Sequence, residues 1–421
     1  MARISPGILD YLAAAILMCG VLSYVFWSSN EIFNTASLVA VVLYVIVAGP
    51  TSVDDGIGRS PVALGVAFAL VTLLNGLVNA ASVSQILTQV AYAISVVFFL
   101  VFGHRFLNLH KNVTLLVSGG VLFVGISIAI LGVFFDINTT DARQGFLGFP
   151  AMQGIAQNIN YNMVMAILSL CLFIALGRER SRAFYAATIA GVALMLLMSG
   201  SRGALLGVLV AGGVATIVWI WRPPGALVLA LSLSILLMLF WVDWEYVLVD
   251  LNRGIAGTST DFAALRLEKG LNNRDDIWNA AIAMFADRWL FGWGDISVVE
   301  DRLVNWYGAP TTAVQNGYMM VALRTGAVGL VLWSAIIVLT MMRYVDFARR
   351  AGAFSRAALW VFIAAIFVLV DNMFRTYSPG GVGFIPTMML VSVSYLLWLA
   401  NPRRQRLSRH RTTNASSYIF R

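Results

Sequence analysis

Residues 243–312, DWEYVLVDLNRGIAGTSTDFAALRLEKGLNNRDDIWNAAIAMFADRWLFGWGDISVVEDRLVNWYGAPTT, are the one long polar stretch of an otherwise apolar chain. The stretch holds 11 acidic and 6 basic residues, a net charge of −5 (6 − 11), whereas the whole chain has a formal net charge of +8. Hydrophobic residues make up 60% of the chain. Because unpaired polar groups are costly in hydrocarbon, we expect this stretch to lie outside a bilayer that the remaining chain crosses.

Apolar segments close to the roughly 20 residues that a membrane helix needs recur along the chain. They are 8–27, 36–49, 61–80, 83–102, 113–134, 159–177, 183–199, 203–221, 225–242, 316–342, 355–371 and 383–400. The pattern predicts an all-α polytopic membrane protein with about 12 transmembrane helices, which form a single domain over residues 1–421. Within it, we expect a large polar loop over residues 243–315 and a basic tail over residues 401–421.

Lysine and arginine residues predict the orientation of the helices. If the N-terminus lies inside, 18 of the 28 basic residues fall on the inner side. This bias follows the positive-inside rule, so we expect both termini in the cytoplasm and the large loop in the periplasm. The positive charge then reflects contact with anionic inner-leaflet lipid, and a nucleic-acid partner is not needed to explain it. The first apolar segment exceeds the roughly 7–15 residues of a secretory signal core, so we expect an uncleaved helix.

Histidine and cysteine residues give no sign of a metal site. His104 and His110 flank Arg105 and Lys111 on the predicted cytoplasmic face, with no acidic or cysteine neighbour in the sequence. The two cysteines fall inside apolar segments, where a structural disulfide is not expected. We therefore predict metal-independent chemistry without a cofactor.

The segment SGSRGALLG (199–207) joins two apolar segments with almost no loop between them. Arg202 stands where the second helix should begin, and the backbone N–H groups of a helix start attract the same anions as its guanidinium. Ser199 and Ser201 add hydroxyl groups to the turn, so we predict a site for an anionic substrate. The alternative is that Arg202 only anchors its helix at the membrane interface.

Within the loop, NNRDDIWNAAIAMFADRWLF (272–291) predicts an amphipathic helix. Trp278, Ile282, Phe285 and Trp289 recur at helical spacing and form one apolar face. We expect this face to lie on the membrane-embedded bundle or on the lipid interface.

Charged residues gather at the start of this predicted helix. Asn273 is a good N-cap, and Asp275 and Asp276 occupy the first turn, where negative charge is favoured. Arg274 beside them is a second candidate ligand for an anion. An exposed ion pair of small energetic value would also explain it.

Other polar residues are expected on the outer face, where they are candidates for substrate binding. Polar groups at membrane depth tend to be functional, although hydrogen bonds between helices are the alternative. The candidates are Arg143 in the segment 136–160, Gln315, Asn316 and Tyr318 where the loop enters the next helix, Arg324 about two turns further, and Asp371 and Arg375 in the last outer connection.

Several motifs together resemble the O-antigen ligase and polysaccharide polymerase superfamily. They are SGSRGALLG (199–207), NRDDIW (273–278), GWG (292–294), QNGY (315–318) and TGAVGL (325–330). Their order, their spacing and the late polar loop agree with the family, most clearly from about Arg143 to Leu330. The resemblance implies a membrane-embedded, GT-C-like inverting glycosyltransferase. Its donor would be an undecaprenyl-pyrophosphate-linked oligosaccharide, and its acceptor lipid A core in a ligase or another lipid-linked repeat unit in a polymerase.

The resemblance also implies roles for particular residues. The arginine of the family's SxSRG turn matches Arg202, and the arginine before the loop tryptophan matches Arg274. The family usually has His-Asn where this chain has Gln315 and Asn316. That histidine is generally proposed to activate the acceptor, and glutamine cannot do so because it cannot take a proton.

The chemistry of the residues supports the same reaction. A pyrophosphate leaving group needs fixed cations where negative charge develops. Arg202 and Arg274 suit this need, because a guanidinium is permanently charged and binds phosphate with two parallel hydrogen bonds. An acceptor hydroxyl needs a base within reach, and Asp275, Asp276 and Asp371 are equal candidates.

We therefore predict an exopolysaccharide or O-antigen polymerase of the bacterial inner membrane. A ligase is the nearest alternative. A transporter or flippase of lipid-linked sugar would instead place charged residues deep in several helices, and a non-catalytic partner in polysaccharide export would explain Gln315. The candidate partners are the lipid-linked donor, the glycan acceptor, membrane lipid, and chain-length regulator or export proteins.

Overall fold

A computed structural model gives the fold, and it is helical apart from one short hairpin. It describes residues 6–25, 30–48, 59–80, 82–135, 139–144, 150–152, 159–177, 182–199, 201–221, 274–311, 314–351, 356–375 and 384–401. The predicted helix 225–242, residues 243–273 of the predicted loop with the N-cap Asn273, and nearly all of the basic tail lie outside these residues.

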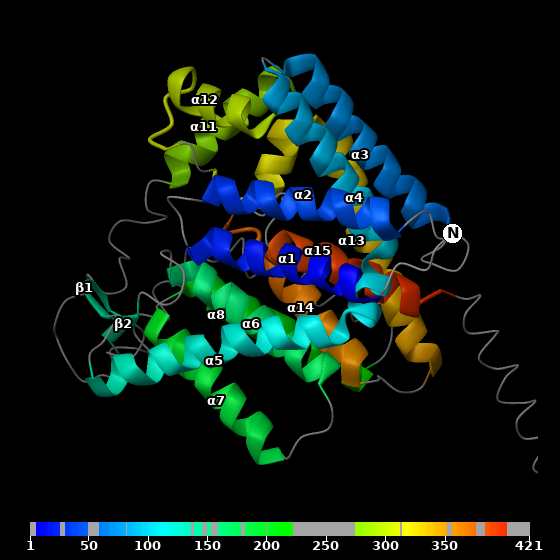
Figure 1. Cartoon of the computed structure of the whole chain (residues 1–421). Coiled ribbons are helices and arrows are strands. Elements are labelled where there is room, and N and C mark those ends of the chain that lie inside the picture. The colour runs from blue at the N-terminus through cyan, green and yellow to red at the C-terminus, as the bar shows by residue number, and fades with distance from the viewer. Residues whose placement is uncertain are drawn as a thin grey trace, which may run out of the picture.

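The long helices follow the predicted apolar segments closely (Figure 1). They are α1 (Pro6–Val25), α2 (Asn30–Ala48), α3 (Arg59–Asn79), α4 (Val83–Leu109), α5 (Lys111–Phe135), α6 (Ile159–Leu176), α7 (Arg182–Ser199), α8 (Arg202–Trp221), α13 (Gly317–Ala351), α14 (Arg356–Asp371) and α15 (Phe384–Leu399). By length and composition, five of the described helices could cross a membrane, and six further apolar helices are shorter. A count of about 12 transmembrane helices stays a prediction.

The centre of the bundle is formed by α14 and α15. All side chains from Phe384 to Leu397 on α15 are buried, as expected for a helix that is surrounded by other helices. Helix α15 packs on α4, α13 and α14, and α14 packs in turn on α6 and α8. The end of α14 therefore lies among helices that come from both halves of the sequence.

A two-stranded hairpin interrupts the otherwise helical fold. Strand β1 (Thr139–Gln144) pairs antiparallel with β2 (Pro150–Met152), and β2 contacts α5 and α7. The predicted all-α class is confirmed, and the hairpin is one short addition to it, because a segment punctuated by glycine and proline satisfies its backbone polar groups by pairing with itself.

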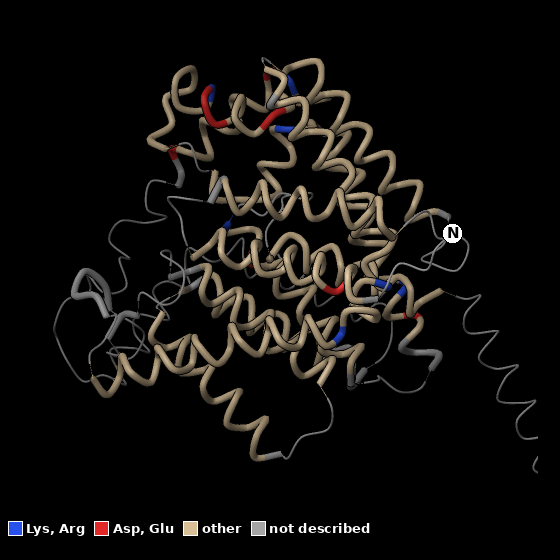
Figure 2. The backbone as a smooth tube through the Cα atoms, in the orientation of Figure 1, with Lys and Arg blue, Asp and Glu red and all other residues tan. Residues whose placement is uncertain are grey.

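Charged residues gather outside the long helices. Figure 2 shows that most of the tube through the bundle carries neither acidic nor basic residues, whereas both kinds cluster on α11 (Arg274–Asp287) and α12 (Ile296–Asn305). These two short helices belong to the predicted loop. Their position at one end of the bundle agrees with a polar segment that does not enter hydrocarbon.

Helix α11 forms where the sequence predicts it, but a different face is buried. Ile277, Ala281 and Met284 are buried, whereas Ile282 and Trp289 are more than half exposed. Of the predicted face, Trp278 and Phe285 pack against this buried cluster, whereas Ile282 and Trp289 do not. Alanine permits a closer approach than a large side chain does, and α11 makes that approach to α12 and α13.

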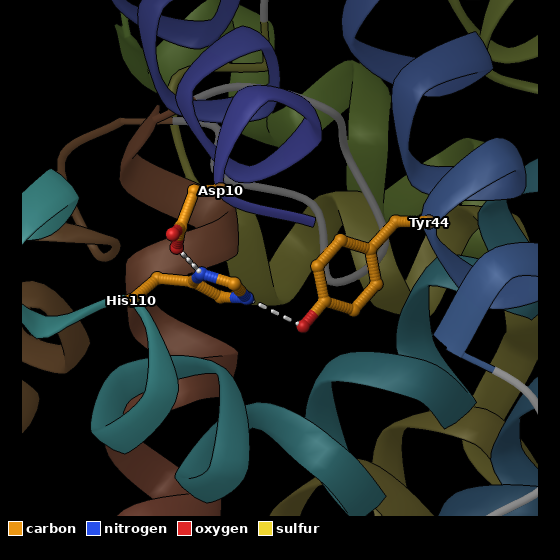
Figure 3. Close-up of polar contacts among 3 residues, drawn as sticks. All are labelled: Asp10, Tyr44 and His110. Atoms are coloured by element: carbon orange, nitrogen blue, oxygen red, sulfur yellow. Dashed lines mark hydrogen bonds and ion pairs between the residues drawn. The ribbon is translucent and has the colours of Figure 1, made fainter. Parts of the chain in front are cut away.

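A histidine joins the first helices of the chain (Figure 3). The Nδ1 atom of His110 lies 2.6 Å from a carboxylate oxygen of Asp10 on α1, and its Nε2 atom lies 2.7 Å from the hydroxyl of Tyr44 on α2. The local sequence does not show this acidic neighbour of His110, because it lies 100 residues earlier in the chain. Among the described residues, no group of three potential ligands could hold a metal ion.

Two glycines set the distance between α8 and α14. Four residues apart, Gly203 and Gly207 are expected from the sequence to allow close helix packing. A Cβ atom at Gly207 would lie 2.9 Å from the ring of Phe367, and one at Gly203 would lie 3.2 Å from the Cβ atom of Phe374. Both side chains belong to the α14 segment, so the close approach is confirmed.

Replacing Gly207 with alanine is therefore expected to destabilise the protein by about 1–3 kcal/mol, because the added methyl group overpacks the contact with Phe367. Thermal unfolding of the purified protein in detergent would measure the change. The matched control is Gly212→Ala on the same helix, where a Cβ atom would meet nothing within 4 Å. Equal effects of the two substitutions would contradict this account of the packing.

Candidate active site

The turn between α7 and α8 is held by the hydroxyl groups of its two serines. Ser199 donates to the carbonyl of Leu196 at 2.8 Å and accepts from the N–H of Ser201 at 3.1 Å. Ser201 accepts from the N–H of Ala204 at 3.4 Å, which is the bond of a helix N-cap. Both serines are buried.

The end of α14 supplies an ion pair to this turn. Arg375 lies 3.1 Å from a carboxylate oxygen of Asp371, and it donates to the hydroxyl of Ser201 at 2.7 Å. Asp371 is completely buried, and Arg375 is 7% exposed. A buried charge is tolerated only when it is paired and hydrogen-bonded, so these three residues form one unit.

The start of α13 is joined to the same end of α14. The N–H of Gly317 donates to the carbonyl of Asn372 at 2.7 Å, and the hydroxyl of Tyr318 donates to the carbonyl of Leu369 at 2.8 Å. Asn316 caps α13, because its side chain accepts from the N–H of Met319. The QNGY motif therefore lies beside Asp371.

Gln315 has a backbone conformation that is uncommon for its residue type. Its φ angle is +53°, in the left-handed region that residues other than glycine seldom adopt. Such conformations cost free energy and cluster at functional sites. The first residue of the QNGY motif is thus held in an unusual geometry.

Helix α11 of the loop contacts Val314, the residue directly before the QNGY motif. The indole N–H of Trp278 donates to the carbonyl of Val314 at 3.2 Å, and Ile277 and Val314 are buried in one apolar cluster. Arg274 is the first residue of α11, one turn before these contacts, and Arg202 is the first residue of α8. Hydrogen bonds therefore connect α11 to residue 314, Gly317 to the end of α14, and the start of α8 to Arg375.

The remaining predicted residues lie in other places. Arg143 is on β1, and Asp275 and Asp276 are in the first turn of α11, where Asp276 is exposed. Arg324 is buried, and with Gln89 and Asp295 it forms what we call the second polar group. It donates to the carbonyl of Gly294 at 3.2 Å and to the side chain of Gln89 at 3.1 Å.

Four amide side chains on α3 and α4 were not predicted as part of any site. These residues, which we call the amide group, contact the segment 288–297 of the loop, α13, or each other. They are Asn75, Asn79, Gln85 and Gln89. The signal was a pair of amides four residues apart on each of two adjacent apolar helices, which places each pair on one helix face.

Glu300 on α12 lies close to the second polar group. Burial raises the pKa of Glu300 above its ordinary value, the negative charge of Asp295 adds to this effect, and the positive charge of Arg324 opposes it. The carboxyl group of Glu300 therefore binds its proton more tightly in the native state than in the unfolded state. The free energy of unfolding consequently falls as the pH rises from the ordinary pKa of 4.5 through the raised pKa.

The Glu300→Gln variant is expected to be more stable than the parent protein at neutral pH, because glutamine cannot ionise. The gain in stability should disappear toward about pH 4, where Glu300 of the parent protein is mostly protonated in both the native and the unfolded state. Thermal unfolding in detergent at both pH values would measure it. Asp301→Asn, which removes an exposed carboxylate from the next position, is the control, and a gain that persists at low pH would contradict the assignment.

Comparison with known proteins agrees with the motifs. Residues 187–334 match the family model described as O-Antigen ligase. No curated protein matched the chain. The matched segment contains the turn at Ser201, helices α11 and α12, and the QNGY motif. It therefore supports the placement of this chain in the superfamily of O-antigen ligases and polysaccharide polymerases, which are membrane enzymes of the glycosyltransferase type.

Proposed function

We propose that this chain polymerises undecaprenyl-pyrophosphate-linked oligosaccharide repeat units on the periplasmic face of the bacterial inner membrane. The proposal includes an inverting, metal-independent transfer. The observation that carries it is a chain of contacts between two helix starts, each with an arginine as its first residue. The start of α8 bonds to the buried Asp371–Arg375 pair through Ser201, the end of α14 bonds to Gly317, and α11 bonds through Trp278 to Val314, three residues before Gly317.

Helix starts suit a pyrophosphate for a general physical reason. Their backbone N–H groups carry partial positive charge, and a guanidinium on the first residue adds a full charge at the same place. Two such starts, with Arg202 and Arg274, would stabilise the charge that develops on the leaving pyrophosphate. The polar loop 243–315 and the excess of basic residues on the predicted inner side of the membrane both support a reaction outside the cytoplasm.

In the proposed reaction, a hydroxyl oxygen of the acceptor attacks the anomeric carbon of the donor sugar. The bond between that carbon and the pyrophosphate oxygen breaks, and undecaprenyl pyrophosphate leaves with the electron pair. The hydroxyl proton passes to a base. Because Gln315 cannot accept it, we assign this role to Asp371, which lies beside the QNGY motif.

A direct test uses the purified protein in nanodiscs with lipid-linked repeat units. We expect a ladder of longer glycans on a gel. Addition of lipid A core distinguishes the two enzyme classes, because transfer onto the core without elongation would identify a ligase. Translocation of the lipid-linked sugar without any glycosyl transfer would overturn the proposal in favour of a transporter.

A further inference from the structure

Helix α13 is broken at Gly326, nine residues after it begins. Gly326 has φ 65° and ψ −168°, so the helix changes direction there. A continuous helix would pair the N–H groups of residues 327 and 328 with the carbonyl groups of residues 323 and 324. A break in a membrane helix therefore leaves four backbone groups to be satisfied by another part of the protein.

A loop segment fills this break. The carbonyl groups of Leu323 and Arg324 accept from the N–H groups of Trp293 and Gly294, at 2.7 and 2.9 Å. On the other side of the break, Ala327 and Val328 donate to the carbonyl groups at positions 289 and 290, at 2.7 and 3.2 Å. We call residues 289–294 the strap. All four orphaned groups of α13 are thus bonded to the strap.

Glycines on both sides allow the strap to enter. A Cβ atom at Gly326 would lie 2.2 Å from the backbone of Leu290, and one at Gly292 would lie 2.5 Å from the carbonyl oxygen of Leu323. Both glycines have positive φ angles, which residues with side chains seldom adopt. This contact accounts for Gly292 of the GWG motif and Gly326 of the TGAVGL motif, which the proposed chemistry does not use.

Asn75 joins the strap to α3, and Gln89 joins residues next to the strap and the break to α4. The side chain of Asn75 donates both to the carbonyl of Phe291 in the strap and to that of Arg324 in the break. Gln89, which is completely buried, accepts from Arg324 at 3.1 Å and donates to the carboxylate of Asp295. Asp295 is the N-cap of α12, so Gln89 connects the break in α13 to the start of α12.

These contacts distinguish the break from that of a transporter. In transporters, broken helices use their released carbonyl groups to bind ions or substrate. In this chain the released carbonyl groups are already bonded to the strap, and the guanidinium of Arg324 lies over the ring of Tyr92 at 5.3 Å. The break therefore serves to orient the first turns of α13, which begin at the QNGY motif.

We propose that Asn75 and Gln89 are positioning residues for glycan transfer, which act by locking the strap into the break of α13. The hydrogen bonds of Asn75 and Gln89 fix the direction of residues 317–325 and the positions of α11 and α12. They thereby fix the relative positions of Gln315, Arg274 and the end of α14. This inference rests on the proposed function. Neither amide touches the reacting atoms, so both act through the elements that they hold.

The test compares Gln89→Leu with Gln85→Leu, one turn earlier on the same helix. Gln85 bonds to Ser297 in an exposed contact, so its replacement should change little. For Gln89→Leu we expect kcat to fall about 10²-fold while KM for the lipid-linked donor changes less than about twofold, because the groups are misplaced but still present. Asn75→Ala, which removes only neutral hydrogen bonds, is the second variant if Gln89→Leu does not fold.

A distance measurement makes the test independent of activity. Spin labels at the exposed positions Val78 on α3 and Asp301 on α12, with Cys19 and Cys171 replaced by alanine, report the placement of α12. We expect a narrow distribution in the parent and in Gln85→Leu, and a broad one in Gln89→Leu. A narrow distribution in Gln89→Leu would overturn the inference. Failure of the parent protein to elongate glycans would instead overturn the proposed function, and the distances would still decide whether Gln89 fixes α12.

Discussion

The Arg202→Ala variant is expected to elongate lipid-linked glycans about 10³-fold more slowly than the parent protein, because it lacks a fixed cation at the developing pyrophosphate charge. The helix start of α8 would remain, since Ser201 still caps it through the N–H of Ala204. The defect should therefore appear in kcat, with little change in the amount of folded protein in the membrane. Quantification of the product ladder over time measures the effect.

Arg202→Lys tests the geometry of the interaction. Lysine keeps the positive charge but lacks the planar fork that binds two phosphate oxygens at once. We expect activity between that of the parent and that of the alanine variant. Full activity of the lysine variant would show that only charge matters at this position.

Arg182→Ala is the matched control for both variants. Arg182 is also the first residue of a long apolar helix, but it begins α7 at the end opposite to the turn at Ser201. Its replacement should leave elongation unchanged. An equal loss in the two alanine variants, or full activity of Arg202→Ala, would remove the main support for the proposed pyrophosphate site.

The fold could be predicted well from composition because the boundaries of membrane helices follow from hydrophobicity alone. Each described long helix begins close to a predicted apolar segment, with α2 starting earliest relative to its prediction, at Asn30 instead of residue 36. Helices α4 and α13 extend past their predicted ends, to Leu109 instead of residue 102 and to Ala351 instead of residue 342. The break at Gly326 could not be predicted, since it depends on the strap. Its sequence signal, a glycine inside an apolar segment, also occurs at positions that simply allow close packing, such as Gly207.

The candidate site was predicted in part. The residues at Ser201, Gln315 and Asp371 were found because polar side chains at the ends of apolar helices are conspicuous, and the structure brings their segments together. Arg324 was grouped with them because of its charge, but it is bound to Gln89 and Gly294 in the second polar group. Which polar residues meet depends on helix packing across long sequence separations, and no periodicity reports that.

Replacing Asp371 with asparagine is expected to impair both folding stability and transfer. Asp371 is completely buried beside Arg375, and loss of one partner of a buried ion pair leaves a charge without its counterion, at a cost of about 3–5 kcal/mol. A loss of activity in this single variant would therefore not show whether the carboxylate takes part in the reaction. Thermal unfolding and elongation must be measured together on the same preparation.

A double-mutant cycle separates the two contributions. In Asp371→Asn combined with Arg375→Gln, both charges are gone, so most of the lost stability should return, since a neutral pair needs no counterion. If Asp371 is the base, elongation by the double variant should stay about 10²-fold below that of Arg375→Gln alone, because neither side chain can take the hydroxyl proton. Equal elongation by these two variants would limit Asp371 to a structural role, and the base would then have to be sought at Asp275 or Asp276 in the first turn of α11.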